Sequence, residues 1–378
     1  YLGRSDPADA VGRDITPLDH DDAVEADPQG RYGNDVMAGG GDADTMFGQL
    51  GDDLMQGDGE IATLMVVAPF IARTLGVDDS GGNPDTDQTL YFNVPERASD
   101  GDDYLEGNGG SDLMYGGLGQ DDMIGGSSAL YGLETEFMRP DTTDFLYGGA
   151  GIAIARNDTG ATSFGLASED PDTHAITTGA DGHARDADFI MGDNANVYRL
   201  VDAASDSFRV FNYDDYGPLK IIPRAMQQLD YTLGGADYNA GVYVDGAAML
   251  DGQPADNGAA DLIHGESGDD IIFGMTGSDV IFGEGQDDDI VGGYGHDWIS
   301  GGTGQDGIIG DDGIVYTSRN SATYGESLYG IDALLARDPE PKYSNGNVLN
   351  ELIATPGSIQ TALINPAEQL KKSVDLVP

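Results

Sequence analysis

Residues 274–300 read GMTGSDVIFGEGQDDDIVGGYGHDWIS, and three residue types recur in this stretch every nine positions. Each repeat has an Asp, an apolar residue two positions later and a Gly four positions after the Asp; the three Asp residues are Asp279, Asp288 and Asp297. A nine-residue period fits neither a helical heptad nor the two-residue alternation of a long strand. It fits a three-residue strand followed by a six-residue turn, repeated along the chain.

The same pattern occurs fourteen times, in blocks of three, three and six copies and in two single copies. The apolar position holds Met or Leu in the early copies, and Ile at the second single copy and in the last block. The recurring acid is Asp35, Asp44, Asp53, Asp103, Asp112, Asp121, Asp144, Asp188, Asp261, Asp270, Asp279, Asp288, Asp297 and Asp306.

Two repeats are expected to form one coil of eighteen residues, because each turn reverses the path of the chain. The apolar residue of each short strand then points inward and its two neighbours point outward. Ile281, Ile290 and Ile299 should fill the thin core, and Gly in the turns permits backbone angles that other residues avoid. Successive coils should stack at the strand spacing, about 4.8 Å.

This stacking predicts two rows of carboxylates, one on each edge of the coil. In the last block one row contains Asp261, Asp279 and Asp297, and the opposite row contains Asp270, Asp288 and Asp306. Carboxylates this close repel one another strongly in a partly dry site. A hard cation between the turns removes the repulsion, and carboxylate plus carbonyl oxygens are a ligand set for Ca²⁺ rather than Zn²⁺.

A lone Asp in a turn is more simply explained by the preference of Asp for turns. The regular array favours Ca²⁺, so all fourteen recurring Asp residues are predicted metal ligands. Additional acids beside them, such as Asp52, Asp102, Asp269 and Asp287, are expected to face solvent.

The segments GGYGHDWIS (292–300) and GGTGQDGII (301–309) match the pattern G-G-x-G-x-D-x-U-x, so the chain resembles the RTX or hemolysin-type calcium-binding repeat family. The resemblance implies an all-β fold, a parallel β-roll whose turns hold several Ca²⁺ ions through the Asp and through loop carbonyls. It also implies secretion from a Gram-negative bacterium, usually through a type I system. Copies that lack a turn Gly, at Asp42, Ala259 and Gln286, are expected to hold Ca²⁺ less tightly.

Long insertions interrupt the repeats, and we expect the chain to leave the roll as an extended strand and to return in register. One continuous roll of fourteen half-turns then has at most twelve calcium sites between successive turns. The expected organisation is an acidic arm at 1–29, the roll at 30–316 with insertions at 60–98, 127–142, 152–186 and 196–257, and a C-terminal extension at 317–378.

The composition limits the partners. The chain has 378 residues, 17 basic and 68 acidic side chains, a formal charge of −51 and no Cys. This charge argues against binding nucleic acid or anionic lipid, and no apolar run is long enough to span a membrane. Twelve Ca²⁺ ions would leave a net charge of about −27, still a solvated acidic surface.

The insertion at 196–257 concentrates bases, namely Arg199, Arg209, Lys220 and Arg224. They either contact an anionic partner or form salt bridges to the roll of the same chain, and we favour the second reading. The first part of this insertion is expected to form β structure, and the Pro-containing part after it to be irregular. In the C-terminal extension, IDALLAR (331–337) predicts a short helix, and the tail either crosses to a neighbouring subunit or joins a further module.

No catalytic motif accompanies the repeats: there is no H-E-x-x-H, no G-x-S-x-G, no phosphate-binding loop and no EF-hand loop. His264 and His296 are expected at the surface. We therefore expect no enzymatic activity and a calcium-dependent structural module that forms a homo-oligomer or polymer through its lobes and termini. The alternatives are the repeat region of a larger secreted enzyme or toxin, and a carbohydrate-active lobe at 196–257.

Overall fold

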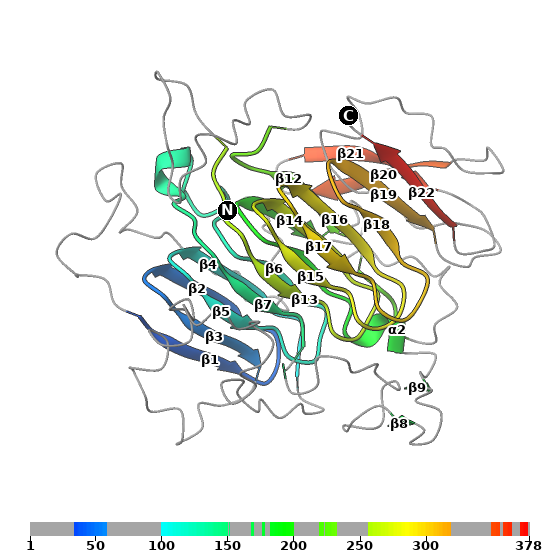
Figure 1. Ribbon diagram of the computed structural model, residues 1–378, viewed down its shortest axis with the longest axis horizontal. Coiled ribbons are helices and arrows are strands. Elements are labelled where there is room, and N and C mark those ends of the chain that lie inside the picture. The colour runs from blue at the N-terminus through cyan, green and yellow to red at the C-terminus, as the bar shows by residue number, and fades with distance from the viewer. Residues whose placement is uncertain are drawn as a thin grey trace.

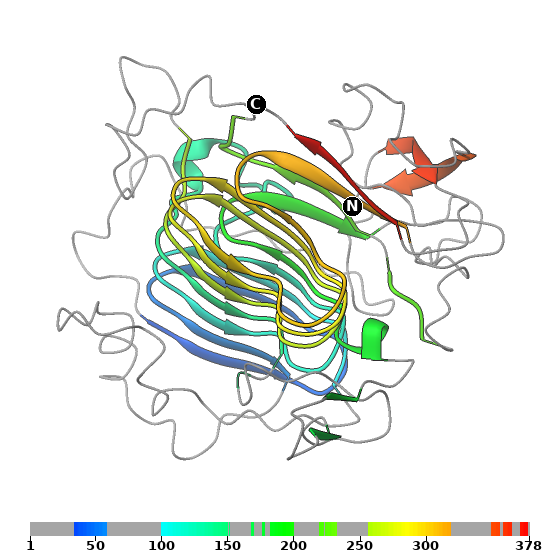
Figure 2. The same cartoon turned by 45° about the vertical axis from the view of Figure 1, so that its right-hand side comes forward.

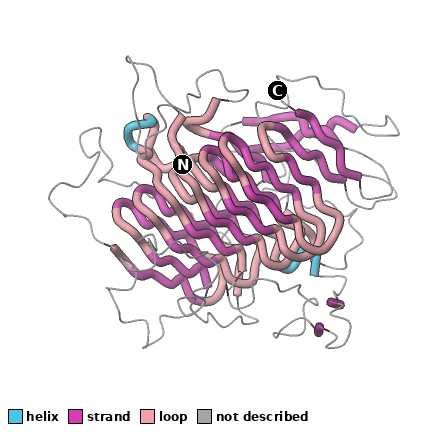
Figure 3. Tube along the Cα trace, in the orientation of Figure 1, coloured by secondary structure: helices cyan, strands magenta, loops and turns pink. Residues whose placement is uncertain are grey.

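A computed structural model describes the roll and several shorter segments of the chain. The described residues are 34–58, 100–149, 151, 168–169, 176–177, 182–199, 219–222, 224–232, 256–318, 349–355, 358–364 and 371–376. The predictions for residues 1–29, 60–98 and 331–337 lie outside these segments. Within them the chain winds into two facing sheets of parallel strands, and the coils stack from β1 to β18 (Figures 1 and 3).

The two sheets take alternate strands of the roll and have seven strands each. In spatial order the first sheet contains β1 (Val36–Gly40), β3 (Leu54–Asp58), β5 (Leu113–Tyr115), β7 (Phe145–Tyr147), β13 (Leu262–His264), β15 (Val280–Phe282) and β17 (Trp298–Ser300). The second sheet contains β2 (Thr45–Leu50), β4 (Tyr104–Gly109), β6 (Asp122–Ile124), β10 (Phe189–Met191), β14 (Ile271–Thr276), β16 (Asp289–Tyr294) and β18 (Gly307–Ile309). The predicted parallel β-roll is therefore confirmed.

The insertions do not disturb the register of the roll. Ile272 pairs with Ile290, one coil of eighteen residues later. Met123 pairs with Ile190 in the same way, although 67 residues separate them. Each return strand therefore places its apolar residue beside the one before it, as one continuous roll requires.

The inner core consists of the apolar residue of each short strand. These side chains are buried between the two sheets: Met46, Met55, Leu105, Met114, Met123, Leu146, Ile190, Ile263, Ile272, Ile281 and Ile290. Met37 and Ile299, near the two ends, are only partly buried. Ile308 belongs to the last half-turn and is 45% exposed, so the expectation that the apolar residue of every short strand points into the core is wrong at this position. In the described residues no strand of the second sheet follows β18, so no later coil covers Ile308.

A second core lies on the outer face of the second sheet, where the sequence predicted side chains that simply point outward. β11 (Ala195–Arg199), β12 (Arg224–Gln228) and β19 (Gly313–Ser318) contribute residues to this core, and the first two pair antiparallel (Figure 2). The buried residues are Tyr104, Ile124, Tyr131, Phe189, Met191, Ala195, Val197, Met226, Ile271, Phe273, Met275, Val291, Ile309 and Val315. β11 and β19 are thus extended strands by which the chain leaves the roll, as expected, whereas β12 arises in a segment predicted to be irregular.

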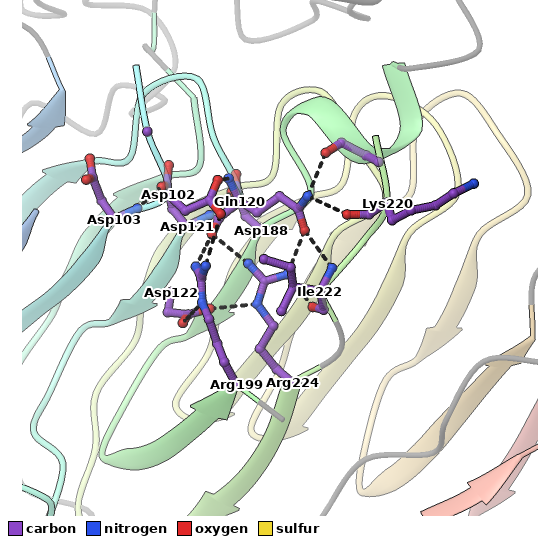
Figure 4. A network of polar contacts seen from close by, with 12 residues as sticks. Asp102, Asp103, Gln120, Asp121, Asp122, Asp188, Arg199, Lys220, Ile222 and Arg224 are labelled. Carbon is purple, nitrogen blue, oxygen red and sulfur yellow. Dashed lines mark hydrogen bonds and ion pairs between the residues drawn. The ribbon is translucent and has the colours of Figure 1, made fainter. Parts of the chain in front are cut away.

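Two buried arginines, one from β11 and one from β12, form ion pairs with the roll (Figure 4). Arg199 Nε contacts Asp122 Oδ2 at 2.8 Å and Arg199 NH1 contacts Asp102 Oδ2 at 3.1 Å. Arg224 Nε contacts the other Asp122 oxygen at 2.8 Å. The expected salt bridges to the roll are confirmed for Arg199 and Arg224, while Arg209 lies outside the described residues. Removing one partner of such a pair leaves a buried charge unpaired, which lowers the stability of the fold by about 3–5 kcal/mol.

The C-terminal extension returns to its own chain in the described part. β22 (Lys371–Leu376) pairs antiparallel with β19, and β20 (Leu349–Thr355) pairs with β21 (Ser358–Ile364). The remaining described elements are the 3₁₀ turn η3 (Glu136–Met138), the pair β8 (Ser168–Glu169) and β9 (Ile176–Thr177), and the helix α2 (Gly182–Arg185).

The outer face of the first sheet carries a stack of rings. Tyr115, Tyr147, His264 and Phe282 follow one another with centroids 4.5–5.1 Å apart and nearly parallel planes. His264 is 4% exposed, so the expectation of a surface position is wrong; His296 is exposed as expected. Burial lowers the pKa of His264 to about 3. The ring is therefore neutral at pH 7, and its contact with Glu284 at 2.8 Å is a hydrogen bond rather than an ion pair.

The inner core predicts a large difference between two chemically identical substitutions. Ile281→Ala opens a cavity at a fully buried site and should lower the free energy of unfolding by about 2–5 kcal/mol. Ile308→Ala, at the exposed end, should change it by no more than about 0.5 kcal/mol. Urea denaturation in saturating Ca²⁺ measures both, and equal effects would contradict the assignment of the core.

Candidate metal centre

The fourteen recurring Asp residues form two continuous rows, because each one immediately precedes a strand of the roll. The row along the first sheet is Asp35, Asp53, Asp112, Asp144, Asp261, Asp279 and Asp297. The row along the second sheet is Asp44, Asp103, Asp121, Asp188, Asp270, Asp288 and Asp306. The opposite rows predicted for the last block are confirmed, and the single copies Asp144 and Asp188 join them.

In every Asp after the first of its row, one carboxylate oxygen links the turn to the preceding turn of the same row. The backbone N–H of Asp261 donates to Asp279 Oδ1 at 2.9 Å, and the N–H of Asp279 donates to Asp297 Oδ1 at 3.0 Å. The same bond joins all neighbours in both rows, six in each, at 2.6–3.2 Å. The Asp rows are therefore part of the backbone hydrogen bonding of the roll.

The other oxygen, Oδ2, is buried and accepts no hydrogen bond in nine of these residues. They are Asp53, Asp103, Asp112, Asp121, Asp144, Asp188, Asp261, Asp270 and Asp279. A buried charged oxygen without a donor costs far more than one that is paired. The repetition of the same unpaired atom along both rows indicates a missing positive ligand rather than an isolated defect.

A Gly carbonyl faces each of these oxygens across the gap between two turns. A Cβ placed on Gly48 would lie 2.6 Å from Asp53 Oδ2 and 2.5 Å from the carbonyl oxygen of Gly107. At Gly192 the corresponding distances to Asp261 Oδ2 and the Gly274 oxygen are both 2.5 Å. Glycine thus leaves a space lined by a carboxylate oxygen and a backbone oxygen, which any side chain would fill.

Burial and mutual repulsion hold these carboxyls toward the protonated form when no cation is present. Burial, followed by repulsion from Asp53, raises the pKa of Asp112 well above its usual value. Burial is also the main cause that raises the pKa of Asp53 to about 7 and that of Asp103 to about 8. A bound cation would replace these protons, since a nearby positive charge favours the ionised carboxylate.

The donor set fits a hard cation. The recurring positions of the turns offer carboxylate and carbonyl oxygens, which are the ligands that Ca²⁺ prefers. In the described part of the chain no three His, Cys, Asp or Glu side chains converge on one point. Both findings agree if backbone carbonyls supply much of the coordination, with one carboxylate from each turn.

A second, unpredicted ladder runs beside each row. Gln305 N donates to Asp287 Oδ1 at 2.8 Å, and Asp287 N donates to Asp269 Oδ1 at 3.0 Å. These bonds point toward the earlier coil, whereas those of the rows point toward the later one. Asp269 and Asp287 are buried, so their predicted solvent exposure is wrong; Asp52 and Asp102 are partly buried and accept similar bonds. Their position directly before the recurring Asp was the only available signal.

Two of the turns that lack Gly keep the turn conformation at a non-Gly residue. Gln286 has φ 73° and Asp42 has φ 69°, in the left-handed region that favours Gly. Gln286 also accepts a hydrogen bond from Gly268 N through its side chain at 3.1 Å. A positive φ at this turn position therefore survives in these copies, and weaker binding of Ca²⁺ at them stays a prediction.

Comparison with known families identifies the repeats. The family described as the RTX calcium-binding nonapeptide repeat matches four segments, residues 29–61, 97–129, 256–290 and 282–314. The matched segments contain β1–β6 and β13–β18, and leave out the half-turns at Asp144 and Asp188. No curated protein and no solved structure matches the chain. No helix in the described segments is long and apolar enough to cross a membrane.

The space between an Asp Oδ2 and a Gly carbonyl, here called the cradle, should bind the metal less well when one methyl group is added to its Gly. Gly48→Ala places its Cβ against Asp53 Oδ2 and the Gly107 carbonyl, and should destabilise the Ca²⁺-bound fold by about 1–3 kcal/mol. The matched control is Gly310→Ala, whose Cβ would have no atom within 4 Å. Circular dichroism during a Ca²⁺ titration should show a higher midpoint for Gly48→Ala alone, and equal midpoints would refute the cradle.

The raised carboxyl pKa values predict an inverted pH dependence without metal. The pKa of Asp103 rises from 3.8 to about 8 on folding, so its contribution to stability is complete below pH 4 and is lost as the pH passes 8. In metal-free buffer, acidification from pH 8 to pH 5 should therefore increase the folded fraction. In Ca²⁺ the same acidification should weaken folding, because protons compete with the ion. Circular dichroism should show these opposite slopes; slopes of the same sign would contradict the role of the rows.

Proposed function

From the RTX calcium-binding nonapeptide repeats that this chain carries, we propose that it is a calcium-dependent structural module of a secreted or cell-surface bacterial protein, such as a surface layer, an extracellular filament, a matrix protein or an adhesin. The observation that carries the proposal is the double row of buried Asp oxygens, each facing a Gly carbonyl of a neighbouring turn. Ca²⁺ binding by these repeats is the part that the family match supports directly.

Ca²⁺ acts as the folding switch in this proposal. Without the ion the carboxylates of each row repel one another, and ordering the Gly-rich turns costs conformational entropy. Calcium modules outside cells typically bind with dissociation constants of about 10⁻⁴–10⁻³ M. The chain therefore stays unfolded where Ca²⁺ is scarce and folds by mass action after export from a Gram-negative cell, through a type I system.

Assembly is the second part of the proposal. The insertions and the C-terminal extension supply lateral contacts between copies, while the roll supplies a rigid rod. The chain is not an enzyme in this proposal, because no catalytic motif occurs in the sequence and the buried carboxylates of the rows are committed to the ion. The roll would serve equally well as the non-catalytic repeat region of a larger secreted enzyme or toxin, and assembly separates these two roles.

Titration of the metal-free chain with Ca²⁺ tests both parts. Millimolar Ca²⁺ should convert a disordered circular dichroism spectrum to a β spectrum, and equal Mg²⁺ should not, because it dehydrates reluctantly and demands octahedral geometry. Light scattering at rising protein concentration should then show oligomers. Asp270→Asn, in the middle of one row, should raise the Ca²⁺ midpoint.

The outcomes are separable. A chain that folds identically in a metal chelator would refute the calcium switch. A folded chain that stays monomeric at high concentration would refute assembly and favour the repeat-region alternative.

A further inference from the structure

Two insertions leave the roll at neighbouring turns. The turn between β6 and β7 is interrupted by the residues near 127–142, and the turn between β10 and β13 by those near 196–257. β6 is hydrogen-bonded to β10, and β7 to β13, so the two interrupted turns lie one above the other. Each turn is therefore completed by segments that are distant in sequence, and its six-residue loop is broken in the middle.

The points at which the two insertions leave the roll are hydrogen-bonded to each other. Ser127 N donates to Asn194 Oδ1 at 2.7 Å, and Ala195 N donates to the Ser127 carbonyl at 3.2 Å. Arg139 forms two hydrogen bonds to the Asp230 carboxylate, at 2.6 and 2.8 Å. Segments of both insertions thus meet at one place on the roll.

A pair of carboxylates outside the two rows lies at this place. Asp141 stands three residues before Asp144, and Asp193 directly follows Gly192, so both occupy turn positions where the repeat has no acid. Both are fully buried, and their side chains are in hydrogen-bonding contact with each other. Two carboxyl groups in contact are both ionised only if a cation lies between them; without one they share a proton.

Asp193 and Asp141 differ in the hydrogen bonds that their carboxyl oxygens accept. Asp193 Oδ1 accepts from Ala259 N at 2.9 Å, and Asp193 Oδ2 accepts from Thr276 N at 2.6 Å. Apart from its contact with Asp193, neither oxygen of Asp141 has a hydrogen-bond partner, although the side chain is fully buried. Asp193 is thus held in place by two backbone amides, whereas Asp141 contacts Asp193 and has no amide donor of its own.

The base nearest to Asp141 along the chain does not neutralise the pair. Arg139 is only two residues away, but its guanidinium is engaged by Asp230 and by the Leu133 carbonyl. The row members Asp144 and Asp261 add further negative charge close to Asp141. The excess of negative charge around Asp141 and Asp193 therefore favours a bound cation at this place.

We propose that Asp141 and Asp193 together bind one additional Ca²⁺ ion, distinct from the ions of the two rows, where the two insertions join the roll. The proposal rests on the proposed function only in taking Ca²⁺ as the ion available to the folded chain. Two carboxylates with nearby backbone oxygens suit a hard divalent cation of the size and flexible coordination of Ca²⁺. Because Asp141 precedes β7 and Asp193 follows β10, the ion clamps both insertions to the roll.

Native mass spectrometry of the full chain in saturating Ca²⁺ tests the proposal by counting ions. Asp141→Asn and Asp193→Asn should each bind one Ca²⁺ fewer than the wild type, with an unchanged β spectrum by circular dichroism. The matched control is Glu134→Gln, which removes an exposed charge from the same insertion and should leave the count unchanged. A folded Asp141→Asn chain with the wild-type count would overturn the proposal and indicate a proton shared by the pair.

Crystals of the wild-type chain keep the proposal testable if either variant fails to fold. An anomalous difference map should place an ion in contact with both carboxylates. Ions confined to the two rows would overturn this proposal and leave the proposed function intact. A wild-type chain that binds no Ca²⁺ at all would overturn both.

Discussion

Repulsion between stacked carboxylates is the constraint on which the rest of this structure depends. The coils stack at the strand spacing, so every recurring Asp lies close to the Asp of the next coil. Within the rows the two oxygens of a side chain have different contacts: Oδ1 accepts the amide of the neighbouring Asp, and Oδ2 faces a Gly carbonyl across the turn. The first bond fixes the register of the coils, and the second contact creates a space lined by buried carboxyl oxygens, which a bound cation stabilises in their ionised form.

This division of contacts also explains why the roll tolerates long insertions. The bond from Asp188 N to Asp270 Oδ1 spans 82 residues and has the same length, 2.8 Å, as the bond from Asp53 N to Asp112 Oδ1, which spans 59. Register is therefore set by the Asp ladder and the buried apolar residue, not by the length of chain between strands. Insertions can then carry other contacts, such as the buried pairs that Arg199 and Arg224 form with Asp122.

The repeated parts of the fold were predictable from the sequence because periodicity specifies them. Nine-residue spacing alone places Asp279 and Asp297 in one row, Asp288 in the other, and Ile281 and Ile290 in the core. The departures come from contacts that no local pattern encodes. The burial of His264 in a ring stack, the burial of Asp269 and the strand after Pro223 all depend on segments that meet only in the fold.

The paired carboxylates of Asp141 and Asp193 show the same limit at the candidate site. In the sequence they are two acids among 68, fifty-two positions apart, with nothing to connect them. They become neighbours only because two insertions interrupt adjacent turns. In contrast, the exposure of Ile308 follows from its place in the last of the fourteen half-turns, because the last half-turn of a roll has no later coil to cover it unless another element does so.

Amide hydrogen exchange at neutral pH, with and without Ca²⁺, tests the dependence of the fold on the two rows most directly. The amides of the row Asp residues, bonded to the next carboxylate, should gain protection together in both sheets when Ca²⁺ is added, and equal Mg²⁺ should not protect them. Equal protection of these amides in metal-free buffer would contradict the claim that cation binding along the rows holds the roll together.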